Sequence, residues 1–131
     1  MLVKTYGSAV YGINATIITI EVSASQGYKF FLVGLPDSAV KESQHRIASA
    51  LQTLNYHWPG KQVVINMAPA DIRKEGSSYD LPLAMGILTA DEKVINGEIG
   101  SFIIMGELSL DGTLQPVKGV LPIAHKGQNF P

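Results

Sequence analysis

Runs of apolar and β-branched residues in the first half of the chain predict strands. Residues 12–25, GINATIITIEVSAS, are rich in Ile and Thr and predict one long strand. Residues 29–34, KFFLVG, form an apolar run too short for a helix, and the turn-forming residues between the two runs predict that they pair as a hairpin. Residues 3–12 predict a further short strand, and residues 62–68, QVVINMA, predict a buried strand that ends at Pro69.

Helical spacing of apolar residues predicts a helix within residues 34–55, where Asp37 can cap the N-terminus. The expected inward face of this helix carries four aliphatic side chains, those of Val40, Ile47, Leu51 and Leu54. Residues 81–90, LPLAMGILTA, are apolar all round, which predicts a buried helix with Pro82 in its first turn. A third helix is expected to begin near Lys118.

The residues between the second and third predicted helices indicate another hairpin. Asp111 and Gly112 lie between SFIIMGELSL and TLQPV, and an Asp-Gly pair is favoured in type I′ turns. Strands, helix, strand, helix, hairpin and helix thus follow one another along 131 residues. This order predicts one mixed α/β domain of the α+β class, in which helices pack on a mostly antiparallel sheet.

Composition and charge narrow the classes of function. Hydrophobic residues make up 46% of the chain and charged residues 16%, which is enough apolar surface for a folded core. The formal net charge of −1 provides no overall field that would attract nucleic acid or a membrane surface. Because the chain has no cysteine, thiol catalysis and zinc-thiolate sites are excluded. No signal peptide or long apolar segment is visible in the sequence, so we expect a cytoplasmic protein without membrane contact.

Three long segments, in this order, carry a resemblance to a known family. They read FFLVGLPDSAVKESQHRIASAL, VVINMAPADIRKEGSSYDLPLAMGIL and IIMGELSLDGTLQPVKGVLPIA. The resemblance extends over nearly the whole chain, which is similar to the N-terminal, Lon-protease-like domain of the ComM/YifB-type, magnesium-chelatase-related AAA+ ATPases of bacteria. It implies the fold of the second domain of ribosomal protein S-five for residues 1–131, as one part of a longer chain with the ATPase motor downstream.

The same resemblance implies a function. In this family the motor uses ATP and Mg²⁺ for the handling of DNA in natural transformation and recombination. The N-terminal domain would bind no cofactor and no metal itself. Its partners would be its own ATPase domain and the sister subunits of a ring, and DNA would be a partner of the full-length protein. We therefore expect a non-catalytic accessory domain that contributes assembly, DNA or partner contacts.

The resemblance to Lon also raises the alternative of a serine peptidase. Lon-type proteases use a serine whose hydroxyl is activated by a lysine. Alignment of KEGSSYD with the protease pattern places Ser78 at the nucleophile, whereas Leu121 stands at the position of the catalytic lysine. Lys118 lies three residues before that position, and Lys74 belongs to a charged loop that we expect to be flexible. Ser78 is therefore a weak catalytic candidate without a partnered base.

A structural interpretation of the same loop is available. Ser77, Ser78 and Asp80 are residue types that cap helices, and they stand directly before the apolar run that begins at residue 81. We expect them to accept hydrogen bonds from the free amides at the start of that helix.

Two further sets of residues suggest a phosphate-binding loop and a metal site, and neither has the required spacing. Gly34, Lys41 and Ser43 loosely resemble a phosphate-binding loop, but Val40 stands where the second glycine of G-x-x-x-x-G-K-[ST] is required. The three acidic residues Asp71, Glu75 and Asp80 match no calcium-loop spacing, and the histidines have no partner at helical spacing, so we predict no metal site.

The remaining hypothesis is a contact surface for a neighbouring domain, a subunit or DNA. Its candidate residues are the charged and polar side chains of the first helix and of the loop before the second, Lys41, Arg46, Arg73, Lys74, Glu75, Ser77 and Asp80. Together with Lys61, the basic members could form a weak basic patch if the fold brings them together. A freestanding protein-binding module stays open as a further alternative.

Overall fold

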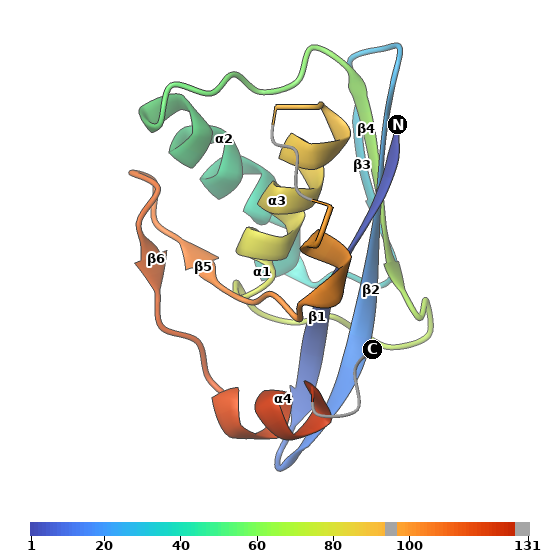
Figure 1. The fold of residues 1–131 in the computed structure, drawn as a ribbon, viewed down its shortest axis with the longest axis vertical. Helices are drawn as coiled ribbons and strands as arrows, with labels where there is room; N and C mark the ends of the chain where they lie inside the picture. The colour runs from blue at the N-terminus through green and yellow to red at the C-terminus, as the bar shows by residue number, and fades with distance from the viewer. Residues whose placement is uncertain (94–96, 128–131) are drawn as a thin grey trace.

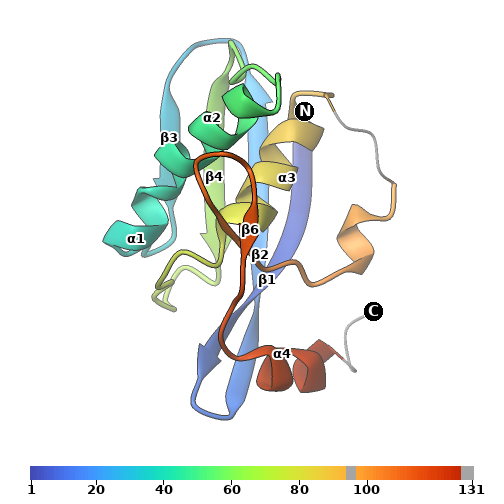
Figure 2. The same ribbon diagram turned by 90° about the vertical axis from the view of Figure 1, so that its left-hand side faces the viewer.

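The computed structural model describes residues 1–93 and 97–127. Its elements follow the order β1 (Leu2–Tyr11), β2 (Asn14–Ser25), β3 (Phe30–Val33), α1 (Ser38–Lys41), α2 (Ser43–Thr53), β4 (Gln62–Ala68), α3 (Asp80–Ala90), η1 (Ile99–Ser101), β5 (Glu107–Leu108), β6 (Leu114–Gln115) and α4 (Val120–Gly127). Figures 1 and 2 show α2 and α3 side by side against one face of the sheet, with α4 across the far ends of β1 and β2. The α+β class and the mainly antiparallel sheet are as the sequence predicts.

The main sheet has the strand order β1-β2-β4-β3, in which β1–β2 and β2–β4 are antiparallel and β3–β4 are parallel. The predicted hairpin between residues 12–25 and 29–34 is therefore wrong. The long strand β4 takes the place beside β2, where Ile65 lies opposite Val22, and β3 pairs on the outer side of β4. The turn between β2 and β3 carries the chain past the position that β4 occupies.

The first strand is longer than the sequence predicts. β1 has ten residues, and every one of them pairs with β2. Gly12 and Ile13 form a two-residue connection between the paired residues Tyr11 and Asn14, and Gly12 has a positive φ of 62°. Mirror-image turns of this length require such backbone angles, which glycine adopts without steric cost. The hairpin of the first sheet therefore joins β1 and β2.

The predicted helix within residues 34–55 forms as two pieces, α1 and α2, separated at Glu42. Asp37 is its N-cap, as predicted, and accepts a hydrogen bond of 2.8 Å from the amide of Val40. Val40, Ile47 and Leu51 face the core, whereas Leu54 is 52% exposed. Leu54 falls outside the core because α2 ends at Thr53, and the helical spacing no longer determines its direction.

The core lies between the helices and one face of the sheet. Alternate residues of the two central strands supply it, Ile18, Ile20 and Val22 from β2 and Val63, Ile65 and Met67 from β4. α3 is buried on nearly all sides, as its apolar sequence predicts. It approaches β2 closely at Gly86, where a Cβ atom would lie 2.6 Å from a methyl group of Val22.

The C-terminal third carries the predicted hairpin and helix. β5 and β6 pair antiparallel, with Glu107 opposite Gln115 and Leu108 opposite Leu114. The connection is a longer loop and not a type I′ turn, because only Gly112 has a positive φ and Asp111 instead accepts hydrogen bonds from Thr113. α4 follows, as expected from the apolar residues after Lys118. Within residues 1–93 and 97–127, no helix combines the length and apolarity needed to cross a bilayer.

Candidate functional site

The loop between β4 and α3, residues 69–79, is held against the segment that follows β3. The amide of Lys74 donates to the carbonyl of Leu35 at 3.0 Å, and the amide of Asp37 donates to the carbonyl of Lys74 at 2.9 Å. Pro36 and Lys74 form an isolated parallel bridge. These bonds join the loop to the segment after β3, so that the loop has a defined backbone path.

Lys74 is fully buried, and its side chain joins the same two segments. Its Nζ donates to the carbonyl of Gly34 at 2.7 Å and also to the carbonyl of Pro69. Burial lowers the pKa of Lys74, and the nearby charge of Asp71 opposes this effect. The expectation that Lys74 lies in a flexible loop and on a contact surface is wrong, because its ammonium group satisfies buried backbone carbonyls instead.

Asp80 is also fully buried and connects three elements. Its carboxylate accepts hydrogen bonds from Ser43 Oγ at 2.6 Å, from Arg46 Nε at 2.7 Å and Nη2 at 3.0 Å, and from the amide of Leu108 at 3.0 Å. α2, α3 and β5 therefore meet at this one carboxylate. The hydrogen bonding to Asp80 raises the pKa of Arg46. Asp80 cannot belong to the predicted contact surface.

The predicted capping role of Ser77, Ser78 and Asp80 is also wrong. The N-cap of α3 is Tyr79, and no side chain caps it by a hydrogen bond. Ser77 Oγ donates to the carboxylate of Glu107 instead. The amide of Gly106 donates to the carbonyl of Ser78 at 2.8 Å, and the amide of Leu81 donates to the carbonyl of Gly106 at 3.0 Å. The segment before β5 thus lies across the start of α3.

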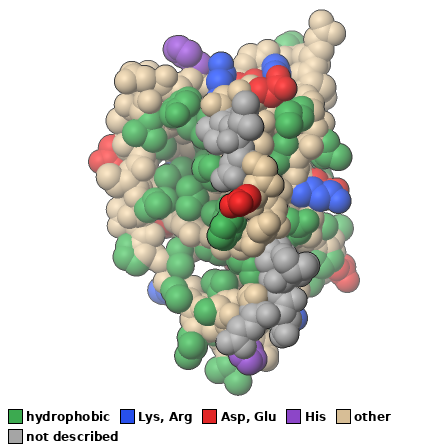
Figure 3. Space-filling view, viewed as in Figure 1, with side chains coloured by type: hydrophobic (Ala, Val, Ile, Leu, Met, Phe, Trp, Pro, Cys, Tyr) green, Lys and Arg blue, Asp and Glu red, His purple; other side chains and the backbone are tan. Residues whose placement is uncertain are grey.

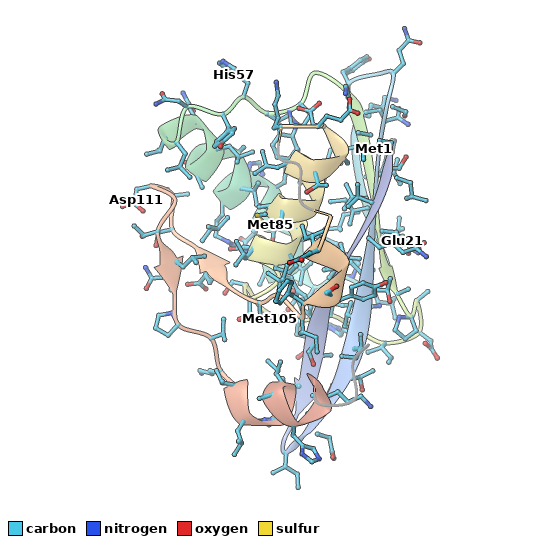
Figure 4. The ribbon with its side chains drawn as sticks, in the orientation of Figure 1. Met1, Glu21, His57, Met85, Met105 and Asp111 are labelled. Atoms are coloured by element: carbon cyan, nitrogen blue, oxygen red, sulfur yellow. The ribbon has the colours of Figure 1, made fainter. Side chains whose placement is uncertain are left out.

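A polar groove of about 630 Å³ opens beside this junction. Its lining includes the end of β1, at Ser8 and Val10, and Ser78 of the loop before α3. The lining also carries three carboxylates and one ammonium group, those of Asp37, Glu75, Glu107 and Lys118. The groove therefore gathers residues from five separate parts of the chain. Met105, labelled in Figure 4, accepts a hydrogen bond of 3.4 Å on its Sδ from the amide of the groove residue Ser8.

The structure places Lys118, and not the residue at the aligned position of the catalytic lysine, in the same groove as Ser78. Ser78 lies in the groove, and so does Lys118, which precedes α4. Leu121, at the position of the catalytic lysine, is 80% exposed. Lys118 stands three residues before the position of the catalytic lysine in the sequence, but the segment before α4 brings it to the same groove as Ser78. Lys118 reaches the groove through the course of the β5–β6 hairpin before it, and the local sequence does not predict the direction in which that hairpin lies.

The predicted basic patch divides into separate places. Lys41 and Arg73 are both exposed and line a second, shallower pocket of about 390 Å³ together with Leu35 and Pro36. Arg46 points to Asp80, and Lys61 forms an ion pair of 3.2 Å with Asp91. On the face shown in Figure 3, Lys and Arg side chains lie singly or in pairs near the margins. Lys41 and Arg73 are therefore the basic residues of the candidate set that share one surface.

The acidic residues do not gather as metal ligands. Asp71 is exposed, Glu75 forms an exposed ion pair of 3.3 Å with Arg73, and Asp80 is committed to Arg46 and its neighbours. In the part of the chain that the structure describes, no group of three or more acidic or histidine side chains is arranged to hold a metal ion.

Comparison with known proteins identifies the family to which this chain belongs. The pattern of the family described as "Subunit ChlI of Mg-chelatase" matches residues 20–130, and the chain belongs to this family. Competence protein ComM of Haemophilus influenzae is 43% identical over 92% of the chain, and the uncharacterized protein YifB of Escherichia coli is 42% identical over 88%. Lon protease 2 of Bacillus subtilis is 28% identical over 88% of the chain. The chain spans about a quarter of the length of each of these relatives.

Proposed function

We propose that this chain is the N-terminal accessory domain of a cytoplasmic, magnesium-chelatase-related AAA+ ATPase. In this proposal the motor binds ATP and Mg²⁺, and the domain contributes assembly, DNA or partner contacts to DNA processing in transformation or recombination. The observation that carries the proposal is the similarity to ComM over 92% of the chain and 24% of that protein. The sequence of 131 residues contains no G-x-x-x-x-G-K-[ST] motif, which supports a nucleotide-binding site outside these residues.

The surface residues left free by the core define where such contacts would form. Lys41 and Arg73 are exposed and line one shallow pocket, which Leu35, also exposed, lines as well. Arg46, Lys74 and Asp80 are committed to internal hydrogen bonds. We therefore assign the DNA or subunit contact to Lys41 and Arg73 and not to the whole candidate set.

A charge-reversal experiment tests this assignment in the native ATPase that carries the chain. Changing Lys41 and Arg73 together to Glu is expected to reduce DNA-stimulated ATP hydrolysis about tenfold at low salt, because two favourable phosphate contacts become repulsive. The matched control changes Lys4 and Lys29, two other exposed lysines, to Glu. Both double variants alter the net charge equally, so equal effects on hydrolysis would contradict a role for this surface.

A serine peptidase is a second candidate, favoured by one observation. Ser78 and Lys118 line the same groove, and the chain is similar to Lon protease 2. A lysine near a serine hydroxyl can take its proton and so activate it for attack on a carbonyl carbon. The accessory function remains the better supported one, because Ser78 and Lys118 have no hydrogen bond that would fix them relative to each other among the described residues.

A fluorophosphonate probe separates the two candidates. The accessory function predicts no labelling of the folded protein, and in particular none that is lost in Ser78→Ala. Ser77→Ala is the matched control, since that hydroxyl is engaged by Glu107. Stoichiometric labelling that disappears in Ser78→Ala and in Lys118→Met, but persists in Ser77→Ala, would establish an activated serine and overturn the non-catalytic assignment.

A further inference from the structure

The polar groove runs along an edge of the main sheet. β1 is an edge strand, with β2 on one side only. In an antiparallel pair, alternate residues direct their backbone N–H and C=O groups away from the partner strand. The carbonyl of Tyr6 accepts from the amide of Ile104 at 2.7 Å on this outer side, so the even-numbered residues of β1 point outward. Val10 belongs to this outward set.

Among the described residues, hydrogen bonds engage the outer edge of β1 as far as Ser8, and Gly119 packs against the Val10 side chain. Tyr6 pairs with Ile103 as an isolated parallel bridge. The amide of Ser8 donates to Met105 Sδ at 3.4 Å, and its carbonyl accepts from the hydroxyl of Tyr79 at 3.3 Å. Gly106 then turns away to Ser78. Among residues 1–93 and 97–127, no hydrogen bond engages the backbone N–H or C=O of Val10.

The open edge at Val10 faces into the groove, and this combination indicates the kind of ligand. Unpaired backbone groups of an edge strand are a template for one more extended chain. Val10 lines the groove that also contains Ser78, whose hydroxyl group is a side-chain hydrogen-bonding partner for such a chain, and Ser77, whose hydroxyl donates to Glu107. The volume of about 630 Å³ accommodates a few residues and not a folded domain.

The charges of the walls select among extended ligands. Asp37, Glu75 and Glu107 supply three carboxylates, and Lys118 supplies one ammonium group. Asp37 accepts hydrogen bonds from the amides of Val40 and Gly76. Glu107 accepts one from Ser77 Oγ, and Glu75 forms an exposed ion pair with Arg73, so all three carboxylates carry their charge in contact with a donor. Carboxylates repel the phosphates of a nucleic acid and attract Lys or Arg side chains.

We propose that the groove binds an extended polypeptide segment that carries Lys or Arg, with the backbone of the segment adding to β1 at Val10 and its cation facing Glu75 and Glu107. This site adjoins the pocket at Lys41 and Arg73, because Asp37 lines both and Glu75 forms an ion pair with Arg73. The inference goes beyond the accessory function, since the groove would bind such a segment whether the domain serves an ATPase or acts alone.

Fluorescence anisotropy with labelled peptides tests the proposal directly. The probes are fluorescein-labelled nonapeptides of alternating Lys and Thr or alternating Glu and Thr, together with a labelled oligo-dT of similar length. The purified chain is expected to bind the Lys-Thr peptide with a dissociation constant on the order of 100 µM. This affinity is expected to decrease as the salt concentration rises. Binding of the Glu-Thr peptide and of oligo-dT is expected to be at least about tenfold weaker. Equal binding of all three probes, or saturable binding of none, would overturn the proposal.

Proline substitution isolates the contribution of the strand edge. Val10→Pro removes the outward N–H without removing a bond to β2, since edge strands tolerate proline where the N–H faces solvent. The matched control is Lys4→Pro, which removes another outward N–H of β1 outside the groove. Val10→Pro is expected to weaken binding of the Lys-Thr peptide about fivefold or more, and Lys4→Pro less than about twofold. Equal weakening by the two variants would contradict addition to β1 at Val10.

A second pair of variants keeps the proposal testable if a proline variant fails to fold. Glu75→Gln with Glu107→Gln removes two charges from the groove and keeps side-chain volume, whereas Glu42→Gln with Glu92→Gln removes two exposed charges elsewhere. The groove pair is expected to weaken binding about fivefold, and the control pair is expected to leave it unchanged. The outcomes are distinct from those of the ATPase experiment because peptide binding is measured here and ATP hydrolysis there. Glu75→Gln also removes the ion pair with Arg73, so the ATPase activity of the Lys41 and Arg73 variant is compared separately.

Discussion

Replacement of Asp80 by alanine is expected to lower the free energy of unfolding by about 3–5 kcal/mol, the range for breaking a buried charge pair. The substitution removes the acceptor for Ser43, for two nitrogens of Arg46 and for the amide of Leu108. These groups are buried or half-buried, so that water cannot fully replace the lost bonds. Urea denaturation followed by circular dichroism measures the loss.

The exposed ion pair of the neighbouring loop is the matched control for Asp80. Arg73 and Glu75 lie 3.3 Å apart with side chains 67% and 66% exposed, and Glu75→Ala is expected to change stability by less than about 0.5 kcal/mol. Asp80→Asn keeps one oxygen and the side-chain volume. Its loss of unfolding free energy is expected to lie between the losses of Asp80→Ala and Glu75→Ala. A loss below about 1 kcal/mol for Asp80→Ala would contradict a structural role for this carboxylate.

Gly34→Ala is expected to destabilise the protein by about 3 kcal/mol. Gly34 has a φ of 108°, and a Cβ atom at this position would lie 2.2 Å from the carbonyl oxygen of Met67. That oxygen belongs to the backbone of β4, so no side-chain rotation relieves the clash. The substitution would also displace the Gly34 carbonyl that receives the ammonium group of Lys74. The same denaturation experiment measures the change.

Gly12→Ala separates backbone conformation from crowding. Gly12 also has a positive φ, 62°, but nothing lies within 4 Å of its added Cβ atom. Only the conformational cost remains there, about 1 kcal/mol. If both variants lose the same stability, the close approach of the segment after β3 to β4 is not what requires glycine at position 34.

Local patterns predict most elements of this fold but not all of their neighbours. Residues 62–68 and 81–90 form the predicted strand and buried helix, because period and apolarity are properties of the segments themselves. The partner of β2 is decided by a distant strand. Proximity in sequence favoured residues 29–34, whereas the structure pairs Val22 with Ile65, which is far along the chain.

The candidate site shows the same limit in its polar residues. Lys74 and Asp80 belong to a charged stretch typical of a solvent-exposed loop, and both are fully buried. Their partners come from Gly34, Pro69, Ser43 and Arg46, and no local periodicity relates these residues. Ser78 was recognisable from the sequence, but the groove around it requires the register of β1 and the path of residues 103–118.

The charged residues around the start of α3 fall into three groups with different surroundings. Arg46, Lys74 and Asp80 stabilise the junction of helices, loop and sheet through internal bonds. Lys41 and Arg73 line an exposed pocket, and Glu75 and Glu107 line the adjoining groove. An accessory domain with two chemically different surfaces is suited to join two partners, and we propose DNA or a sister subunit for the first and a basic polypeptide segment for the second.

The central claim is that this domain serves an ATP-driven motor. The most direct measurement is to isolate the native polypeptide that carries this chain, determine its complete sequence and assay its ATP hydrolysis. We expect a longer polypeptide that contains G-x-x-x-x-G-K-[ST] and hydrolyses ATP in the presence of Mg²⁺. A native polypeptide of about 14.1 kDa that lacks this motif and does not hydrolyse ATP would contradict the claim.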